Sequence, residues 1–346
     1  MLGENDYRSG SQEWSGFVKH GQRTIIAAAT AAALVLLGGC GSGDDAAEGG
    51  SNASSGAGLA VVATTPEVAD FVRTVGGSDV TVTQIIKPNV DPHDYEPTPA
   101  DIQAIGKAAI VVKNGVGLEE WLDQTIESAG FKGTVVDSSQ GVTLRQGGHE
   151  EGEEGHEEGE DAHEGEEHDP HIWHNPLNAK TMVANIEKGL AAADPAHAAA
   201  FAGNVKNYTA ELDKLDADNE AAFARIPADQ RKLVTNHDAF GYYVDRYKLQ
   251  FVGSVIPSLD TSAELSAKQL NELVAKIKAT GTKAIFAETS LPPKSAEAIA
   301  NQAGVKVIGG EDALYGDSIG AEGTPQGTYL GAERHNTQVI VSALGG

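Results

Sequence analysis

The sequence has one cysteine, few aromatic residues and half as many basic residues as acidic ones. A single cysteine cannot form a disulfide within the chain, and it provides no set of thiolates to hold a metal. Lys and Arg number 25 against 50 Asp and Glu, and no basic stripe is present. A nucleic-acid partner is therefore not expected, because phosphate binding needs clustered positive charge. Any metal must be bound by His and carboxylate side chains.

The acidic charge is concentrated in one segment. The net charge is -25, and 12 acidic residues lie among the 21 residues from His149 to Asp169, which include no Lys or Arg. Glycines and dense like charge predict a disordered loop over residues 147–168. Two interpretations stay open, a mobile collector that raises the local cation concentration or a merely solvated insertion. The histidines available for metal collection are His149, His156, His163 and His168.

The N-terminal region predicts export. Three basic residues precede the apolar run 25–37, which is too short to span a bilayer and fits the apolar part of a signal peptide. The motif Leu37-Gly38-Gly39-Cys40 resembles the lipobox of bacterial lipoproteins, in which the cysteine carries the lipid. We therefore expect a signal peptide over 1–39, lipid attachment at Cys40 and a flexible tether over 40–58. The protein would then be extracytoplasmic and anchored to the bacterial cell membrane.

From residue 59 onward, short apolar strands alternate with helices, a pattern that predicts parallel sheets. The fold class is therefore α/β, with two β/α sandwich lobes. A helix predicted over 195–225 would be roughly 45 Å long, enough to brace both lobes. We expect an N-terminal lobe over 59–193, a linking helix over 194–226 and a C-terminal lobe over 227–346. The strands are expected at 59–64, 80–86, 109–114, 134–137, 233–235, 250–255, 284–287 and 305–308.

Three histidines stand in similar polar loops. Asp-Pro-His occurs twice, at Asp91-Pro92-His93 and Asp169-Pro170-His171, and a third histidine lies in Asn236-His237-Asp238. Proline restricts its own backbone and that of the preceding residue, so each Asp-Pro-His presents its ring from a stiff, non-helical loop. Ligands gather at the carboxyl ends of parallel strands, where His93 is expected. The repeated pattern indicates a metal site rather than three unrelated structural histidines.

Four segments resemble the metal-binding lipoproteins of the zinc and manganese ABC importers, the cluster A-I (cluster 9) solute-binding family. The resemblance implies two β/α lobes joined by one long rigid helix, a metal held between the lobes and an ABC permease as partner. It also implies the ligand set His93, His171, His237 and Asp317. We expect the protein to act as a monomer. The matching segments are Asp91–Pro99, Asp169–Trp173, Asn236–Tyr242 and Leu314–Ser318.

Three neutral imidazoles and one carboxylate form a closed four-coordinate set that suits Zn²⁺. In the family that this chain resembles, manganese binders typically have Glu at the position of His237. We therefore interpret the ion as zinc, with manganese or iron as the lesser alternative. A surface metal buffer or adhesin that feeds no transporter is a further alternative. Because the imidazoles must be deprotonated, metal affinity is expected to fall below a pH of about 6.5.

His174 lies three residues after His171 and has three possible roles. It is an alternative ligand, a group that supports a ligand, or a hand-off point from the acidic loop. We favour His171 as the ligand because its Asp-Pro-His frame repeats that of His93.

Two features suggest an enzyme, and both have a better explanation. Glu288 ends a predicted strand and either orients a ligand histidine or acts as a general base beside a zinc-bound water. Four protein ligands leave no position for that water, so the first role is preferred. Gly316-Asp317-Ser318-Ile319-Gly320 fits a nucleophile elbow, but only His335 follows it, in too short a segment for a hydrolase fold. The sequence therefore predicts a binding protein and not an enzyme.

Overall fold

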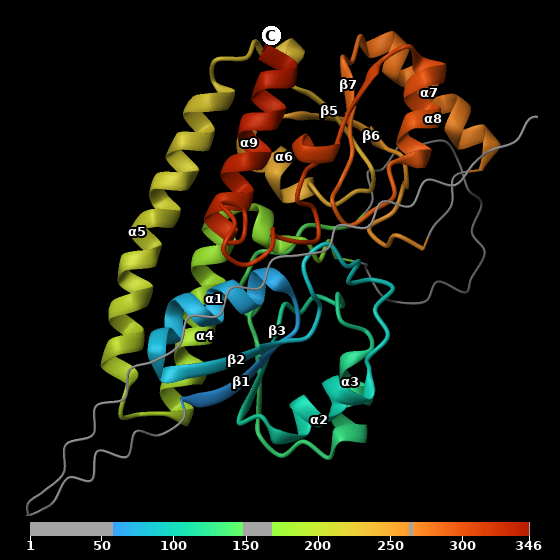
Figure 1. Cartoon of the computed structure of the whole chain (residues 1–346). Coiled ribbons are helices and arrows are strands. Elements are labelled where there is room, and N and C mark those ends of the chain that lie inside the picture. The colour runs from blue at the N-terminus through green and yellow to red at the C-terminus, as the bar shows by residue number, and fades with distance from the viewer. Residues whose placement is uncertain (1–57, 148–167, 263–265, 346) are drawn as a thin grey trace, which may run out of the picture. The chain divides into compact units, whose positions relative to one another are not determined.

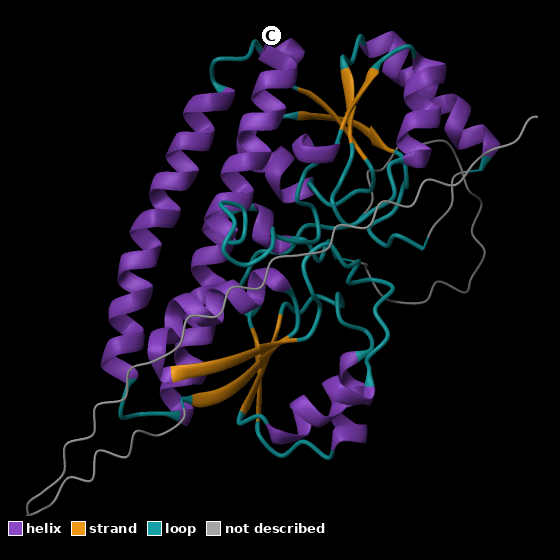
Figure 2. Ribbon diagram, viewed as in Figure 1, coloured by secondary structure: helices purple, strands orange, loops and turns teal. Residues whose placement is uncertain are grey.

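The computed structural model describes residues 58–147, 168–262 and 266–345. The predicted signal peptide, Cys40 and the tether up to residue 57 lie outside these residues, as do His149, His156 and His163. The described part contains two four-stranded parallel sheets, each with helices on both faces (Figures 1 and 2). This confirms the α/β class with two lobes. No helix within the described ranges combines the length and apolar character needed to cross a bilayer.

The first sheet has the strand order β2-β1-β3-β4. Its side chains alternate between two hydrophobic clusters, as Val61 and Ala63 face one and Val62 the other. This period of two, with both faces apolar, is what a parallel sheet covered on both sides requires. Helices α1 (Pro66–Gly76) and α4 (Pro176–Ala193) cover one face, and α2 (Pro99–Lys107) and α3 (Leu122–Ala129) cover the other. The strands are β1 (Leu59–Ala63), β2 (Val80–Gln84), β3 (Ile110–Lys113) and β4 (Thr134–Asp137).

The second sheet repeats this topology in the order β6-β5-β7-β8. Leu233 faces one cluster and Val234 the other, so the alternation is the same. Helix α6 (Gly241–Tyr247) packs on one face, and α7 (Ala267–Thr280) and α8 (Lys294–Ala303) pack on the other. The strands are β5 (Lys232–Thr235), β6 (Gln250–Ser254), β7 (Ala284–Phe286) and β8 (Lys306–Ile308).

Several helices begin where their side chains predict. Thr65 accepts a hydrogen bond from Val68 N at the start of α1, with Pro66 as the first helical residue. Thr98 and Ser266 form capping boxes with Asp101 and Gln269. Helix α3 begins at Leu122 without a side-chain cap.

The long helix α5 (Ala198–Phe223) contacts both lobes. Its 26 residues correspond to roughly 39 Å. Phe201, Tyr208 and Leu212 belong to the first core, whereas Phe223 belongs to the second. The helix begins three residues after the predicted start at residue 195.

A second helix, α9 (Tyr329–Gly345), also contacts both cores and lies beside α5 (Figure 1). Tyr329 and Leu330 pack in the first core, and Ile340 and Leu344 pack in the second. This helix was not predicted from the sequence, and its residues were expected in the second lobe alone. Its buried residues include Glu333, Asn336 and Thr337, so it has no plain apolar stripe. Helix α5 thus links the lobes in the chain, as predicted, and α9 packs across both cores beside it.

Candidate metal centre

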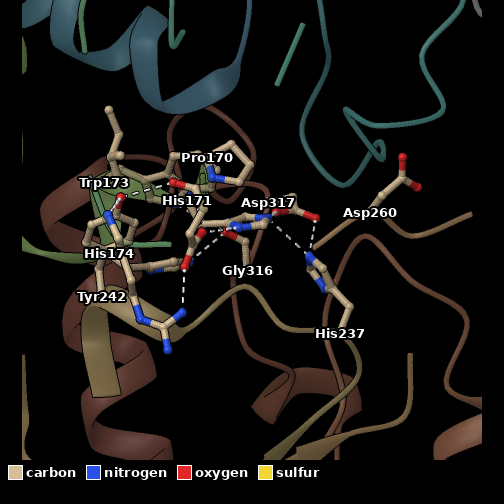
Figure 3. Close-up of polar contacts among 12 residues, drawn as sticks. Pro170, His171, Trp173, His174, His237, Tyr242, Asp260, Gly316 and Asp317 are labelled. Carbon is tan, nitrogen blue, oxygen red and sulfur yellow. Dashed lines mark hydrogen bonds and ion pairs between the residues drawn. The ribbon is translucent and has the colours of Figure 1, made fainter. Parts of the chain in front are cut away.

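The structure brings His93, His171, His237 and Asp317 together, with one ligand atom of each lying within 4.8 Å of the others. His171 Nε2 is 3.3 Å from His93 Nε2 and 3.4 Å from His237 Nε2. The Asp317 oxygens lie 3.3 Å from His171 Nε2 and 3.0 Å from His237 Nε2. Figure 3 shows His171, His237 and Asp317 directed toward one another. No other such group of three or more potential ligands exists among the described residues.

The two Asp-Pro-His segments form the same turn. In each, the aspartate Oδ1 accepts the backbone N–H of the histidine two residues later, at 3.0 Å. Such a turn satisfies the backbone without a helix or sheet and fixes the direction of the following ring. His93 lies in the loop after β2. His171 directly precedes the 3₁₀ turn η2 (Ile172–His174).

His171 is also held by the ends of the first sheet. Asn114, just after β3, donates from Nδ2 to the carbonyl of Pro170 at 2.9 Å. Glu119 accepts hydrogen bonds from Asn114 N and Thr64 Oγ1, so it ties this loop to the end of β1. The loop reverses through Val116, whose φ of 57° is unusual for a branched residue. These contacts place the backbone on which His171 sits at the carboxyl edge of the sheet.

Two buried carboxylates lie beside the Nδ1 atoms of His171 and His237. Asp169 Oδ1 accepts a hydrogen bond from His171 Nδ1 at 2.8 Å, and Glu288 Oε2 lies 2.9 Å from His237 Nδ1. A proton on Nδ1 leaves the Nε2 lone pair directed into the site, as a metal ligand requires. Glu288 also accepts the backbone N–H of His237 at 3.0 Å. The sequence points to Glu288 as a residue that could orient a histidine, whereas Asp169 was not singled out, although Asp-Pro-His contains it.

The charges of the site differ from ring to ring. Burial lowers the pKa of His93 to about 4. Burial also lowers the pKa of His171, but the carboxylates of Asp169 and Asp317 outweigh it and raise the value to about 9. The pKa of His237 is raised in the same way by Asp317 and Glu288. Although burial opposes it, the neighbouring imidazoles lower the pKa of Asp317. Bringing a cation to the site must therefore displace protons from His171 and His237.

His174 does not face the site. It is fully buried, its Nδ1 lies 2.8 Å from Glu333 Oε1, and its Nε2 lies 2.9 Å from the carbonyl of Gly316. Because a carbonyl only accepts, Nε2 carries a proton and cannot bind a metal. Both ring nitrogens are used, so the alternative-ligand interpretation of His174 has no support in this geometry.

Only His168 of the predicted collector histidines falls in the described residues. It lines a cavity of about 540 Å³ together with His93, Glu120 and Asp260. His93 is also the one member of the four-residue group that is not fully buried. The cavity is thus the side from which solvent reaches the site.

The contacts of Ser318 agree with the expectation that Gly316–Gly320 is not a nucleophile elbow. Its Oγ donates to the carbonyl of Ile319 and accepts the backbone N–H of Asn89 at 2.8 Å. His335 instead donates from Nε2 to the carbonyl of Ala313 at 2.9 Å. No contact between these two side chains is present in the described structure, so Ser318 has no base to activate it.

The model of the family described as the periplasmic zinc-uptake complex component A matches residues 61–343. The chain belongs to this family. The zinc-uptake component A family consists of metal-binding substrate-binding proteins of ABC importers, so the chain is a metal-binding substrate-binding protein and not an enzyme.

The names of the relatives mention different metals. The chain is 33% identical over 290 residues to the manganese-binding lipoprotein MntA of Bacillus subtilis, covering 83% of this chain and 90% of that protein. It is 32% identical over 300 residues to the zinc-binding protein TroA of Treponema pallidum, with coverages of 86% and 92%. A solved structure of the periplasmic zinc-binding protein TroA of Treponema pallidum superposes with a TM-score of 0.74 at 31% identity, covering 84% of this chain and 99% of that chain.

Proposed function

We propose that this substrate-binding protein captures Zn²⁺ between its lobes and delivers it to an ABC permease. The observation that carries the proposal is the spacing of the four converging groups: in five of their six pairs the ligand atoms lie 3.0 to 3.7 Å apart, and all lie within 4.8 Å of one another. In a regular tetrahedron, bonds of roughly 2.0–2.1 Å place the ligand atoms roughly 3.3–3.4 Å from one another. Three imidazole nitrogens and one carboxylate at this spacing suit a closed zinc site, with His93, His171, His237 and Asp317 as ligands.

Manganese is the second candidate, because relatives are named as manganese-binding lipoproteins. Mn²⁺ favours carboxylate and water ligands and more than four of them. A set dominated by imidazole, buried except at His93, favours zinc over this alternative. The same comparison makes iron a lesser candidate, although one relative is named as an iron transporter component.

Titration calorimetry with competing chelators tests the zinc proposal. Wild-type protein should bind one Zn²⁺ at least about a hundredfold more tightly than Mn²⁺. His237→Ala should lose zinc affinity by at least about a hundredfold, and His237→Glu should move the preference toward manganese. His197→Ala is the matched control, since His197 is an exposed histidine at the start of α5. Tighter manganese than zinc binding by the wild type would overturn the proposal.

We propose further that the acidic loop over 147–168 collects zinc and passes it to the site. His168 supports this idea, since it lines the same cavity as His93 and continues directly from the His- and Glu-rich sequence. Deleting residues 148–167 should lower the total zinc bound and slow capture at scarce metal, while the tight site remains. Unchanged capture rates in rapid-mixing experiments would leave the loop as a solvated insertion.

The proposed location is extracytoplasmic, with a lipid on Cys40 anchoring a monomer to the cell membrane. Relatives named as lipoproteins support the anchor, and the lipobox-like Leu37-Gly38-Gly39-Cys40 supplies the acceptor. Cys40→Ala should release the protein from the membrane fraction. Cells without the protein should accumulate less zinc under chelation, whereas normal accumulation would favour a metal buffer or adhesin.

A further inference from the structure

The loop that carries Asp317 is attached to the turn that carries His171. The carbonyl of Gly316 accepts two hydrogen bonds, from Trp173 Nε1 at 3.2 Å and from His174 Nε2 at 2.9 Å. Both donors belong to η2, which directly follows His171. Figure 3 shows Trp173, His174 and Gly316 beside the site. A ligand from the first lobe and a ligand from the second are thus joined through one carbonyl.

Helix α9 forms hydrogen bonds with both of the segments that this connection joins. Glu333 lies 2.8 Å from His174 Nδ1, and both side chains are buried. Asn336 accepts a hydrogen bond from Tyr315 N and donates to Tyr315 O, each at 2.8 Å. Tyr329 donates to the carbonyl of Trp173 at 2.6 Å. The helix therefore contacts η2 and the Asp317 loop at the same time.

The ring of His174 has little freedom to turn. It stacks on Phe240 with ring centroids 4.5 Å apart and an angle of 24° between planes. With one nitrogen on Gly316 and the other on Glu333, rotation would break two buried hydrogen bonds and leave their partners unpaired. An apolar side chain at this position would fill the space but would not fix the carbonyl of Gly316.

We propose that His174 is a positioning residue for metal selectivity, because it fixes Asp317 relative to His171 through Gly316 and Glu333. This rests on the proposed zinc function. The distance between His171 Nε2 and Asp317 Oδ1 is 3.3 Å, which suits the short bonds of a four-coordinate ion. A loosened Asp317 loop lets the cage widen, and a wider cage accepts the larger Mn²⁺ with additional ligands. His174 therefore discriminates between the two ions without touching either.

The experiment compares His174→Leu, His174→Gln and the control His335→Leu. Like His174, His335 donates from a ring nitrogen to a loop carbonyl, that of Ala313, but it does not contact Gly316. His174→Leu should reduce the ratio of zinc to manganese affinity by about tenfold, as loss of outer support does in other metal sites. His174→Gln keeps an N–H donor for the Gly316 carbonyl and should restore most of the ratio. His335→Leu should change it much less than His174→Leu does, because His335 packs on Tyr315 but does not bond to the carbonyl that joins Asp317 to η2.

Visible absorption of the Co²⁺-loaded protein gives a second measurement that a loss of stability alone would not change. Four-coordinate Co²⁺ absorbs much more strongly than six-coordinate Co²⁺, so His174→Leu should weaken the bands and His174→Gln should retain them. If His174→Leu does not fold, Glu333→Ala replaces it and should lower both the affinity ratio and the absorption. Glu333→Gln is then the conservative control, because an amide keeps a bond to Nδ1 of His174 and should keep both near wild type. An unchanged affinity ratio and unchanged Co²⁺ spectrum in a folded His174→Leu protein, or in Glu333→Ala, would overturn the inference. Failure of the zinc proposal would instead show as weak zinc binding by the wild type.

Discussion

The two Asp-Pro-His segments have the same tripeptide and the same turn, yet the aspartates do different work. Asp169 accepts a hydrogen bond from the ring Nδ1 of its own histidine, whereas Asp91 accepts one from the hydroxyl of Thr261 in the second lobe. His171 is fully buried, and His93 lines the cavity that leads to solvent. The pKa of His93 is lowered to about 4 by burial, and that of His171 is raised to about 9, since its carboxylate neighbours outweigh burial.

The local sequence determines the backbone turn, and tertiary packing determines the surroundings of the ring. The tripeptide sets the backbone turn, because the aspartate and the backbone N–H are only two residues apart. The surrounding chain sets the charge and exposure of the ring. We therefore expect His171 to be the rigidly held ligand, and His93 to be the ligand that the ion meets first as it enters from solvent.

The largest expected effect comes from removing either ring. His171→Ala and His93→Ala should each lower zinc affinity by at least about a hundredfold in chelator-competition titrations, because each removes a direct ligand. Only His171→Ala should also lower the melting temperature of the metal-free protein by a few degrees, since it leaves the buried Asp169 without its ring partner. Equal melting temperatures for the two variants would contradict the distinction between the segments.

The second effect separates the two aspartates. Asp169→Asn should weaken zinc binding about 10- to 100-fold, because an amide has no negative charge to make the ring of His171 a stronger ligand. Asp91→Asn keeps an oxygen for the turn and should change affinity less than about threefold. Calorimetry on both variants measures the difference. A larger loss in Asp91→Asn than in Asp169→Asn would reverse the assignment.

The third effect is the pH dependence of binding. His171 has a pKa raised to about 9, so its ring is protonated below that pH and must lose the proton to bind metal. Zinc affinity should therefore fall as the pH drops from 9, a higher range than the 6.5 predicted from sequence. His93, with a pKa near 4, should add no dependence in that range.

Calorimetry in buffers of different ionisation enthalpy, between pH 6 and 9, measures the number of protons released when zinc binds. Asp169→Asn should reduce the number of protons released, because it removes a group that raises the pKa of His171. The same raised pKa stabilises the metal-free fold below pH 6.5, and that contribution should disappear as the pH rises through 9. A release that does not change with pH would contradict the assignment of charge to His171.

The smallest effect tests the contact between His93's loop and the second lobe. Thr261→Val removes the hydrogen bond from Thr261 to Asp91 and should lower the free energy of unfolding by about 0.5–1.5 kcal/mol. Zinc affinity should change less than about threefold, since no ligand is touched. Denaturant titration measures the first value and calorimetry the second. A large loss of affinity would mean that Asp91 orients His93 as strongly as Asp169 orients His171.

The predicted elements agree best with the structure where interactions between neighbouring residues determine their bounds. The strand β4 was predicted with its observed bounds, and β1 and β2 begin at the predicted residues 59 and 80. Helix α9 was missed because its buried face carries Glu333 and Asn336, which look like surface residues in a sequence. Their partners, His174 and Tyr315, are distant in the chain and lie beside them only after folding.

The sequence by itself determined the alternation of strands and helices, the stiff turns before His93 and His171, and a donor set limited to imidazole and carboxylate. These follow from interactions between residues a few positions apart and from composition. The tertiary structure decided which nitrogen each ring presents, which rings carry a proton, and that His174 faces away from the site. Those properties depend on buried carboxylates and carbonyls brought from distant segments, because a charge in a low-dielectric interior acts strongly on the groups packed against it.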